Sequence, residues 1–208
     1  GALLGAVQLE ERTTPGAALT LEAGERGWRR ASGAAEVHGD GLSMMLGAYA
    51  DQSDGWVAVH EGRGAADVPL RSESAAAVAR LQWRGEGRVL SARVGGYDEA
   101  RSAGLVGADS TDSGSSLSLI LAQPEGPFGW RVQLWGTRSD LTNASVATAL
   151  DRSSTTPAND QYATPALGWG GNGALRWSSD TSGVEFGVDA RFADGETREL
   201  FRFQGGAF

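Results

Sequence analysis

The sequence predicts an all-β fold, arranged as an antiparallel up-and-down meander of about nine or ten strands. Three observations lead to this prediction. Apolar and polar residues alternate with the two-residue period of a strand, many alternating segments run for about nine residues or more, and short links take turns with long ones. The segment 184–192 shows the pattern best, because its two faces differ in chemistry: Val184, Phe186, Val188, Ala190 and Phe192 oppose Glu185, Asp189 and Arg191.

The other expected strands follow the same rule in chain order. Residues 1–12 contain a glycine-bearing turn and a short strand, and alternation is clear further on, where Leu90 and Val94 oppose Ser91 and Arg93. Strands of about 9 to 11 residues have the length that crosses a membrane when tilted, whereas strands of globular sheets usually have about five or six. The expected strands after residue 12 span residues 17–24, 29–38, 42–51, 72–84, 88–97, 115–123, 128–138, 164–177 and 184–192.

The links between these strands differ in length in a regular way. Every second connection of a meander lies at the same end, so the short links collect at one rim and the long links at the other. Tight turns at one rim and long loops at the other are typical of outer-membrane barrels. The expected short links are residues 39–41, 85–87, 124–127 and 179–183, and the expected long links are residues 52–71, 98–114 and 139–163.

Several aromatic residues lie close to the short links and, by strand parity, mostly on the apolar face: Trp83, Phe128, Trp130, Trp177 and Phe186. A membrane barrel carries such a belt at its interface with the head groups. In a soluble sandwich the same residues would be core aromatics near strand ends. The apolar face carries many Ala and Gly residues, whereas a sandwich core favours large β-branched ones, so the sequence favours the barrel.

Composition excludes several other classes of protein. A formal charge of −8 and a pI near 4.8 give no basic surface for nucleic acid, and the absence of cysteine excludes disulfides and thiolate metal sites. No apolar run approaches the roughly 20 residues of a membrane helix. The chain opens at Gly1 without the basic and apolar regions of a signal peptide, so we expect a piece of a longer protein.

Motifs for catalysis or cofactor binding are weak, and the sequence predicts neither an enzyme nor a cofactor. Residues 168–173 match G-x-G-x-x-G, but a strand and not a helix follows. His38 and His60 are expected at opposite ends of the barrel, too far apart for a shared metal. Six loop carboxylates lack an EF-hand spacing and are interpreted as solvated side chains: Asp51, Asp54, Asp109, Asp112, Asp151 and Asp160.

Charged residues also mark the polar face of the expected strands. They either pair with one another and with a plug or guide an anionic ligand, and pairing is the simpler interpretation. The residues in question are Arg80, Arg93, Arg131, Arg176 and Arg191, with Glu22, Glu185 and Asp189.

Laid out in this way, the chain resembles part of a TonB-dependent outer-membrane receptor. The opening Gly-Ala-Leu-Leu-Gly-Ala-Val-Gln-Leu of residues 1–9 is similar to the end of that family's plug domain, and Asp160-Gln161-Tyr162 resembles the family's approach to a strand after a long loop. The resemblance implies that residues 1–13 end a plug domain and residues 14–208 form the first part of a barrel of about 22 strands. It also implies active uptake of a siderophore, vitamin or saccharide at the bacterial outer membrane. The implied partners are membrane lipid, a small-molecule ligand and a TonB complex, the last reached through a segment outside this chain.

Ligand-binding residues are expected in the long outer loops, where position and chemistry single out Trp56, His60, Arg63, Asn143 and Tyr162. Two other functions stay open. One is a complete small barrel acting as a passive pore or adhesin, and the other is a soluble carbohydrate-binding sandwich that uses the seven tryptophans as stacking platforms.

Overall fold

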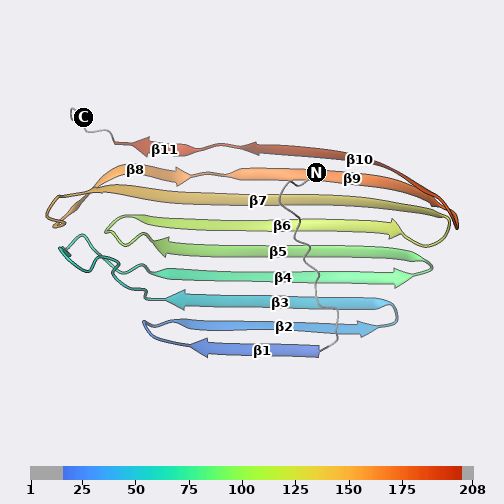
Figure 1. The fold of residues 1–208 in the computed structure, drawn as a ribbon, viewed down its shortest axis with the longest axis horizontal. Helices are drawn as coiled ribbons and strands as arrows, with labels where there is room; N and C mark the ends of the chain where they lie inside the picture. Colours follow the sequence, from blue (N-terminus) through green and yellow to red (C-terminus); the bar gives the residue numbers. More distant parts are fainter. Residues whose placement is uncertain (1–15, 203–208) are drawn as a thin grey trace.

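A computed structural model describes residues 16–202, and these residues form one antiparallel β-sheet of eleven strands (Figure 1). The predicted all-β, up-and-down fold is confirmed. The strands are β1 (Gly16–Ala23), β2 (Arg29–Gly39), β3 (Leu42–Ser53), β4 (Ser72–Gly85), β5 (Arg88–Ser102), β6 (Asp109–Gln123), β7 (Phe128–Thr148), β8 (Thr155–Ala163), β9 (Ala166–Ser178), β10 (Gly183–Gly195) and β11 (Arg198–Phe201).

The chain crosses the sheet nine times. Strands β1 to β7 are single passes in sequence order. One end of β7 pairs with β9 and the other end with β8, while β10 pairs with β9 and β11 with β8. Thus β8 and β9 together make the eighth pass, and β10 and β11 make the ninth (Figure 1). The result agrees with the expected nine or ten strands.

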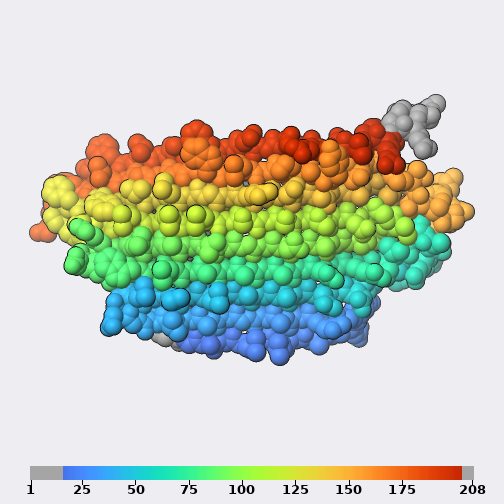
Figure 2. Space-filling view, turned by 180° about the vertical axis from the view of Figure 1, so that it is seen from behind, coloured from blue at the N-terminus to red at the C-terminus, as the bar shows by residue number. Residues whose placement is uncertain are grey.

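The sheet is a single layer within the described residues. On the face shown in Figure 2, the strands form adjoining bands from β1 to β11, and no further layer of residues 16–202 lies over them. Few side chains in this part of the chain are buried, and the buried apolar ones are Ala66 and Ala108, both in links. The apolar side chains of the strands are therefore largely exposed.

Two of the short links are hairpin turns of two residues. Asp40 and Gly41 have φ values of 47° and 77°, and Glu86 and Gly87 have φ values of 53° and 71°. Two positive φ values in succession define the type I′ turn, whose twist matches that of the flanking strands. A Cβ atom on Gly41 would lie 2.2 Å from the carbonyl oxygen of Arg84, so this turn requires glycine for space as well as for φ.

Two of the three expected long links are wrong. Residues 98–114 and 139–163 are mostly strand, because β5 runs to Ser102, β6 starts at Asp109, β7 runs to Thr148 and β8 fills 155–163. These extensions carry polar residues on both faces, so they lack the alternation that marks a half-buried strand. Ladder pairing and contacts such as the 2.7 Å hydroxyl pair of Thr111 and Thr142 hold them in the sheet. Residues 54–71 remain as the one long link among the described residues.

Candidate functional site

The sheet has one apolar face and one polar face along its whole width. Direct strand partners lie on the same face. Met44 pairs with Leu81, and Leu119 pairs with both Ala92 and Leu134. Most of the large side chains of the apolar face are between 37% and 78% exposed: Leu19, Leu21, Val37, Leu42, Met44, Leu46, Leu81, Trp83, Leu90, Val94, Leu117, Leu119, Leu121, Phe128, Val132, Leu134, Leu167, Trp169, Leu175, Trp177, Val184, Phe186, Val188 and Phe192.

These apolar side chains form a band of limited height. On β3 the band runs from Leu42 to Ala50, and on β10 it runs from Val184 to Phe192. At roughly 3.4 Å per residue, both stretches are about 27 Å long. The apolar belt of outer-membrane barrels is about 25 Å tall. For strands tilted by about 35–45°, 27 Å along a strand corresponds to a height of roughly 19–22 Å, which is comparable to that belt.

The band is also inclined to the strands. Ala50 pairs with Ala75, and the next partners in the same row are Asp98 and Ser113, so β5 and β6 leave the band where β3 and β4 are still inside it. At the opposite border, β9 and β10 carry large apolar side chains beyond the row of Leu42. A band inclined to the strands is what tilted strands in a membrane produce.

Aromatic residues lie at both borders of the band. The five predicted for the rim of short links (Trp83, Phe128, Trp130, Trp177 and Phe186) share the apolar face, as the strand register shows. At the other border Trp169 and Phe192 stack, with ring centroids 4.3 Å apart and an interplanar angle of 18°. Two aromatic borders fit the two interfacial girdles of a membrane barrel.

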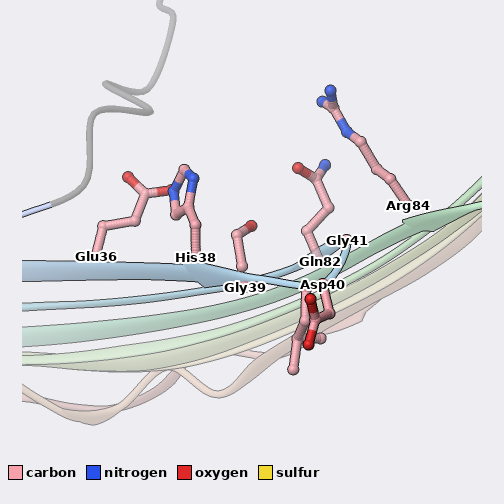
Figure 3. A pocket seen from close by; sticks show the side chains of 9 residues that line it. Glu36, His38, Gly39, Asp40, Gly41, Gln82 and Arg84 are labelled. Atoms are coloured by element: carbon pink, nitrogen blue, oxygen red, sulfur yellow. The ribbon is translucent and has the colours of Figure 1, made fainter.

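The polar face contains a buried carboxylate. Glu36 is 6% exposed, and its Oε1 atom accepts from Arg80 Nη2 at 2.8 Å and lies 2.9 Å from His38 Nε2. Glu36 and His38 border a hollow of about 460 Å³, into which Gln82 and Arg84 also project from the same face (Figure 3). The cluster is a charge-assisted hydrogen-bond network at the end of the short links.

The predicted polar-face charges lie on that face, and several of them are paired. Arg191 Nε lies 2.9 Å from Asp189 Oδ1, and Arg176 donates to the carbonyl oxygen of Pro124. Glu22 lies 4.0 Å from Arg30 on β2, with both side chains about half exposed. These contacts agree with the pairing interpretation for the residues involved.

A second buried carboxylate holds together the links at the opposite end of the sheet. Asp67 is 5% exposed, binds the Arg152 guanidinium through both oxygens, and accepts the Gly64 amide at 2.9 Å. The Ala66 amide donates to the Arg152 carbonyl oxygen, and the Val106 amide donates to the Ala66 carbonyl oxygen. These backbone hydrogen bonds join three links, residues 54–71, 103–108 and 149–154. The Arg152 hydrogen bonds, followed by the Gly64 amide, lower the pKa of Asp67 to about 2.

The lowered pKa gives a pH dependence with a definite sign. A carboxylate with a depressed pKa stabilises the fold above its unfolded pKa, and this contribution is lost as the pH falls toward about 2. We expect the hydrogen-exchange protection of the Ala66 and Val106 amides to stay constant from neutral pH to about pH 5 and to fall below about pH 4. Asp67→Asn should reduce this protection already at neutral pH. Glu61→Gln, at an exposed carboxylate of the same link, is the matched control, and equal effects of the two changes would contradict the role of Asp67.

The structure does not bring the five predicted ligand-binding residues together. Trp56 lies in link 54–71 with the Arg26 guanidinium 5.3 Å from its ring centroid, and His60 and Arg63 are exposed in the same link. The expectation that Asn143 and Tyr162 lie in loops is wrong, because they belong to β7 and β8. His38 and His60 do lie at opposite ends of β3, as predicted.

Four of the six predicted loop carboxylates lie in strands instead: Asp51 in β3, Asp109 and Asp112 in β6, and Asp160 in β8. Asp51 accepts the Trp28 indole N–H at 3.0 Å, Asp112 accepts the Tyr97 hydroxyl at 3.1 Å, and Asp151 accepts from Ser153. No group of three or more His, Asp or Glu side chains within residues 16–202 is arranged to hold a metal ion. The same residues contain no helix with the length and hydropathy needed to cross a membrane.

Sequence reasoning missed the two buried carboxylates and two polar-face tyrosines, Tyr49 and Tyr97. The tyrosines had a usable signal, since each is an aromatic residue at a polar position of an alternating strand. Glu36 and Asp67 had none, because their partners lie 44 and 85 residues away in the chain.

The comparisons with known proteins add no relative: no protein-family model and no curated protein matches the chain.

Proposed function

We propose that the chain forms part of the wall of a β-barrel in the bacterial outer membrane, and that this barrel belongs to a TonB-dependent receptor for active uptake of a scarce solute. One observation carries the barrel proposal. A sheet of nine passes has an exposed apolar band on one face, about 27 Å long along a strand at roughly 3.4 Å per residue, and polar side chains on the other. Lipid on one side and a polar lumen on the other would satisfy both faces.

The soluble sandwich is less well supported. A sandwich covers the apolar face of each sheet with a second sheet about 10 Å away. The described residues 16–202 supply no such second layer, and the apolar face is largely exposed. In water, an apolar surface of this size would drive aggregation.

The number of passes limits how a barrel that contains this sheet could close. Strand β1 lies at one edge of the sheet, and the β10–β11 pass lies at the other. With nine alternating passes the two edges run in the same direction, so direct closure would need a parallel pair. Bacterial barrels are antiparallel with even strand numbers. An antiparallel barrel containing these passes needs an odd number of further strands, a condition that a barrel of ten strands and one of about 22 both satisfy, so the choice of the larger barrel depends on the family resemblance.

The receptor proposal rests further on the resemblance of the opening residues to the end of a plug domain. Those residues, and the proposed domain boundary after residue 13, lie outside the described part of the chain. Siderophores, vitamins and saccharides are the candidate solutes, and the TonB complex is the proposed source of energy.

The test uses the intact gene product in its own host. Cell fractionation should place it in the outer membrane. Deletion of the gene should abolish accumulation of a radiolabelled solute. Dissipating the inner-membrane proton gradient in cells that keep the gene should abolish the same accumulation. Recovery in the soluble fraction would contradict the barrel. Uptake that depends on the gene but persists without the gradient would contradict the receptor and support a passive pore.

A further inference from the structure

Two tyrosines flank a small residue on the polar face, toward the end of the sheet with the longer links. Tyr49 on β3 pairs directly with Ala76 on β4, and Ala76 pairs directly with Tyr97 on β5. The three residues therefore lie in one row, and the two tyrosines are two strand spacings apart, about 10 Å. Since Ala76 has only a methyl group, no long side chain stands between the two tyrosines in this row. We call this feature the tyrosine trough.

Neighbouring groups on the outer strands β2 and β6 draw both rings away from Ala76. The Arg30 guanidinium on β2 lies 5.6 Å from the centroid of the Tyr49 ring. On the other side, the Tyr97 hydroxyl donates to Asp112 on β6, and a Cβ atom on Gly114 would lie 2.5 Å from the Tyr97 ring. Tyr49 is 38% exposed and Tyr97 is 41% exposed, so each ring presents a surface to solvent.

Hydrogen-bond acceptors line the next row of the same face. Asp51 pairs with Ser74, and Ser74 pairs with Glu99. Asp51 is oriented by the Trp28 indole, and Glu99 lies 3.4 Å from Arg101. Two carboxylates and a hydroxyl thus lie within one residue of the trough. They suit a ligand that donates several hydroxyl hydrogen bonds, and Arg30 and Arg101 offset their negative charge.

We propose that the tyrosine trough binds a neutral carbohydrate, with one sugar ring over Ala76 between Tyr49 and Tyr97 and its hydroxyl groups donating to Asp51 and Glu99. The C–H faces of a sugar ring are apolar and pack against aromatic rings at roughly 3.5–4.0 Å. The two strand spacings, about 10 Å, therefore leave room for one sugar ring over Ala76, packed against either tyrosine. The inference rests on the proposed function, because it takes the polar face to line the lumen of a barrel and names the class of solute that this barrel binds.

Binding is measured with the intact gene product in detergent, by isothermal titration with maltoheptaose, xylohexaose and cellohexaose. At least one of these neutral oligosaccharides should bind. Tyr49→Ala and Tyr97→Ala should each weaken the Kd by roughly tenfold, the effect of losing one aromatic stacking contact. Ala76→Leu should abolish binding with both rings retained, because its side chain fills the floor of the trough.

Tyr162→Ala is the matched control, because Tyr162 is an exposed tyrosine whose neighbour Gln161 pairs with Asn143 of the polar face, which places Tyr162 on the opposite face. It should leave the Kd unchanged in a protein that unfolds at the same urea concentration. The inference is overturned if none of the three oligosaccharides binds, or if Tyr162→Ala weakens binding as much as Tyr49→Ala does. If the protein is found in the outer membrane but binds none of the sugars, only this inference is overturned. Sugar binding by a protein found in the soluble fraction would overturn the proposed barrel instead.

Discussion

Replacing Leu119 by arginine is expected to destabilise the membrane-inserted protein by about 2–4 kcal/mol. Leu119 lies on β6 in the middle of the apolar band, where its direct partners are Ala92 and Leu134. If this face meets lipid, the arginine has to place its charge in the hydrocarbon layer or distort the bilayer to reach water. The free energy of unfolding, measured by urea titration in phospholipid vesicles, gives the effect.

The control for this change lies three residues away on the same strand. Ser116 is exposed on the polar face, opposite Gly95 and Thr137. Ser116→Arg should change the free energy of unfolding by about 0.5 kcal/mol or less, as most surface substitutions do. If both arginines cost the same, or if Ser116→Arg costs more, the assignment of the two faces to lipid and lumen is wrong.

Replacing Glu36 by alanine is expected to cost about 3 kcal/mol, the lower part of the range for breaking a buried ion pair. Both Arg80 and His38 lie within 2.9 Å of the same Glu36 oxygen, and the Arg80 side chain is only 11% exposed. The substitution removes the carboxylate from a buried guanidinium. Urea titration in vesicles again measures the loss.

Glu22 supplies the comparison for Glu36, because it faces Arg30 on the same side of the sheet at 4.0 Å with both side chains 46% exposed. Glu22→Ala should cost under about 0.5 kcal/mol, since solvent screens an exposed pair. Similar losses for Glu36→Ala and Glu22→Ala would show that burial does not strengthen the Glu36 network.

The fold could be predicted where the two faces of a strand differ in chemistry. The strand expected at residues 42–51 is observed as Leu42–Ser53, and the one at 184–192 as Gly183–Gly195. Prediction failed where both faces are polar. The outer half of β7 and all of β8 carry Ser, Asn and Asp residues, whose propensities favour loops, and ladder pairing overrides those propensities.

The site was harder to predict than the fold, because its contacts depend on register. The apolar band is readable strand by strand, but its inclination requires knowing that Ala75 pairs with Asp98. The tyrosine trough requires the pairing of Tyr49, Ala76 and Tyr97, which lie in three separate strands. No local pattern gives such a pairing, since a shift by one residue moves every side chain to the other face.

The most direct test of the central claim, that the apolar face contacts lipid and the polar face contacts water, is spin-label accessibility along β6. Single cysteines are placed in turn at positions 116 to 121, which is straightforward in a chain without native cysteine. In vesicles, labels at Leu117, Leu119 and Leu121 should collide preferentially with oxygen, and labels at Ser116, Ser118 and Ile120 with a water-soluble nickel complex. A two-residue period with this phase is the predicted result. Uniform access to the nickel complex at all six positions would contradict the account.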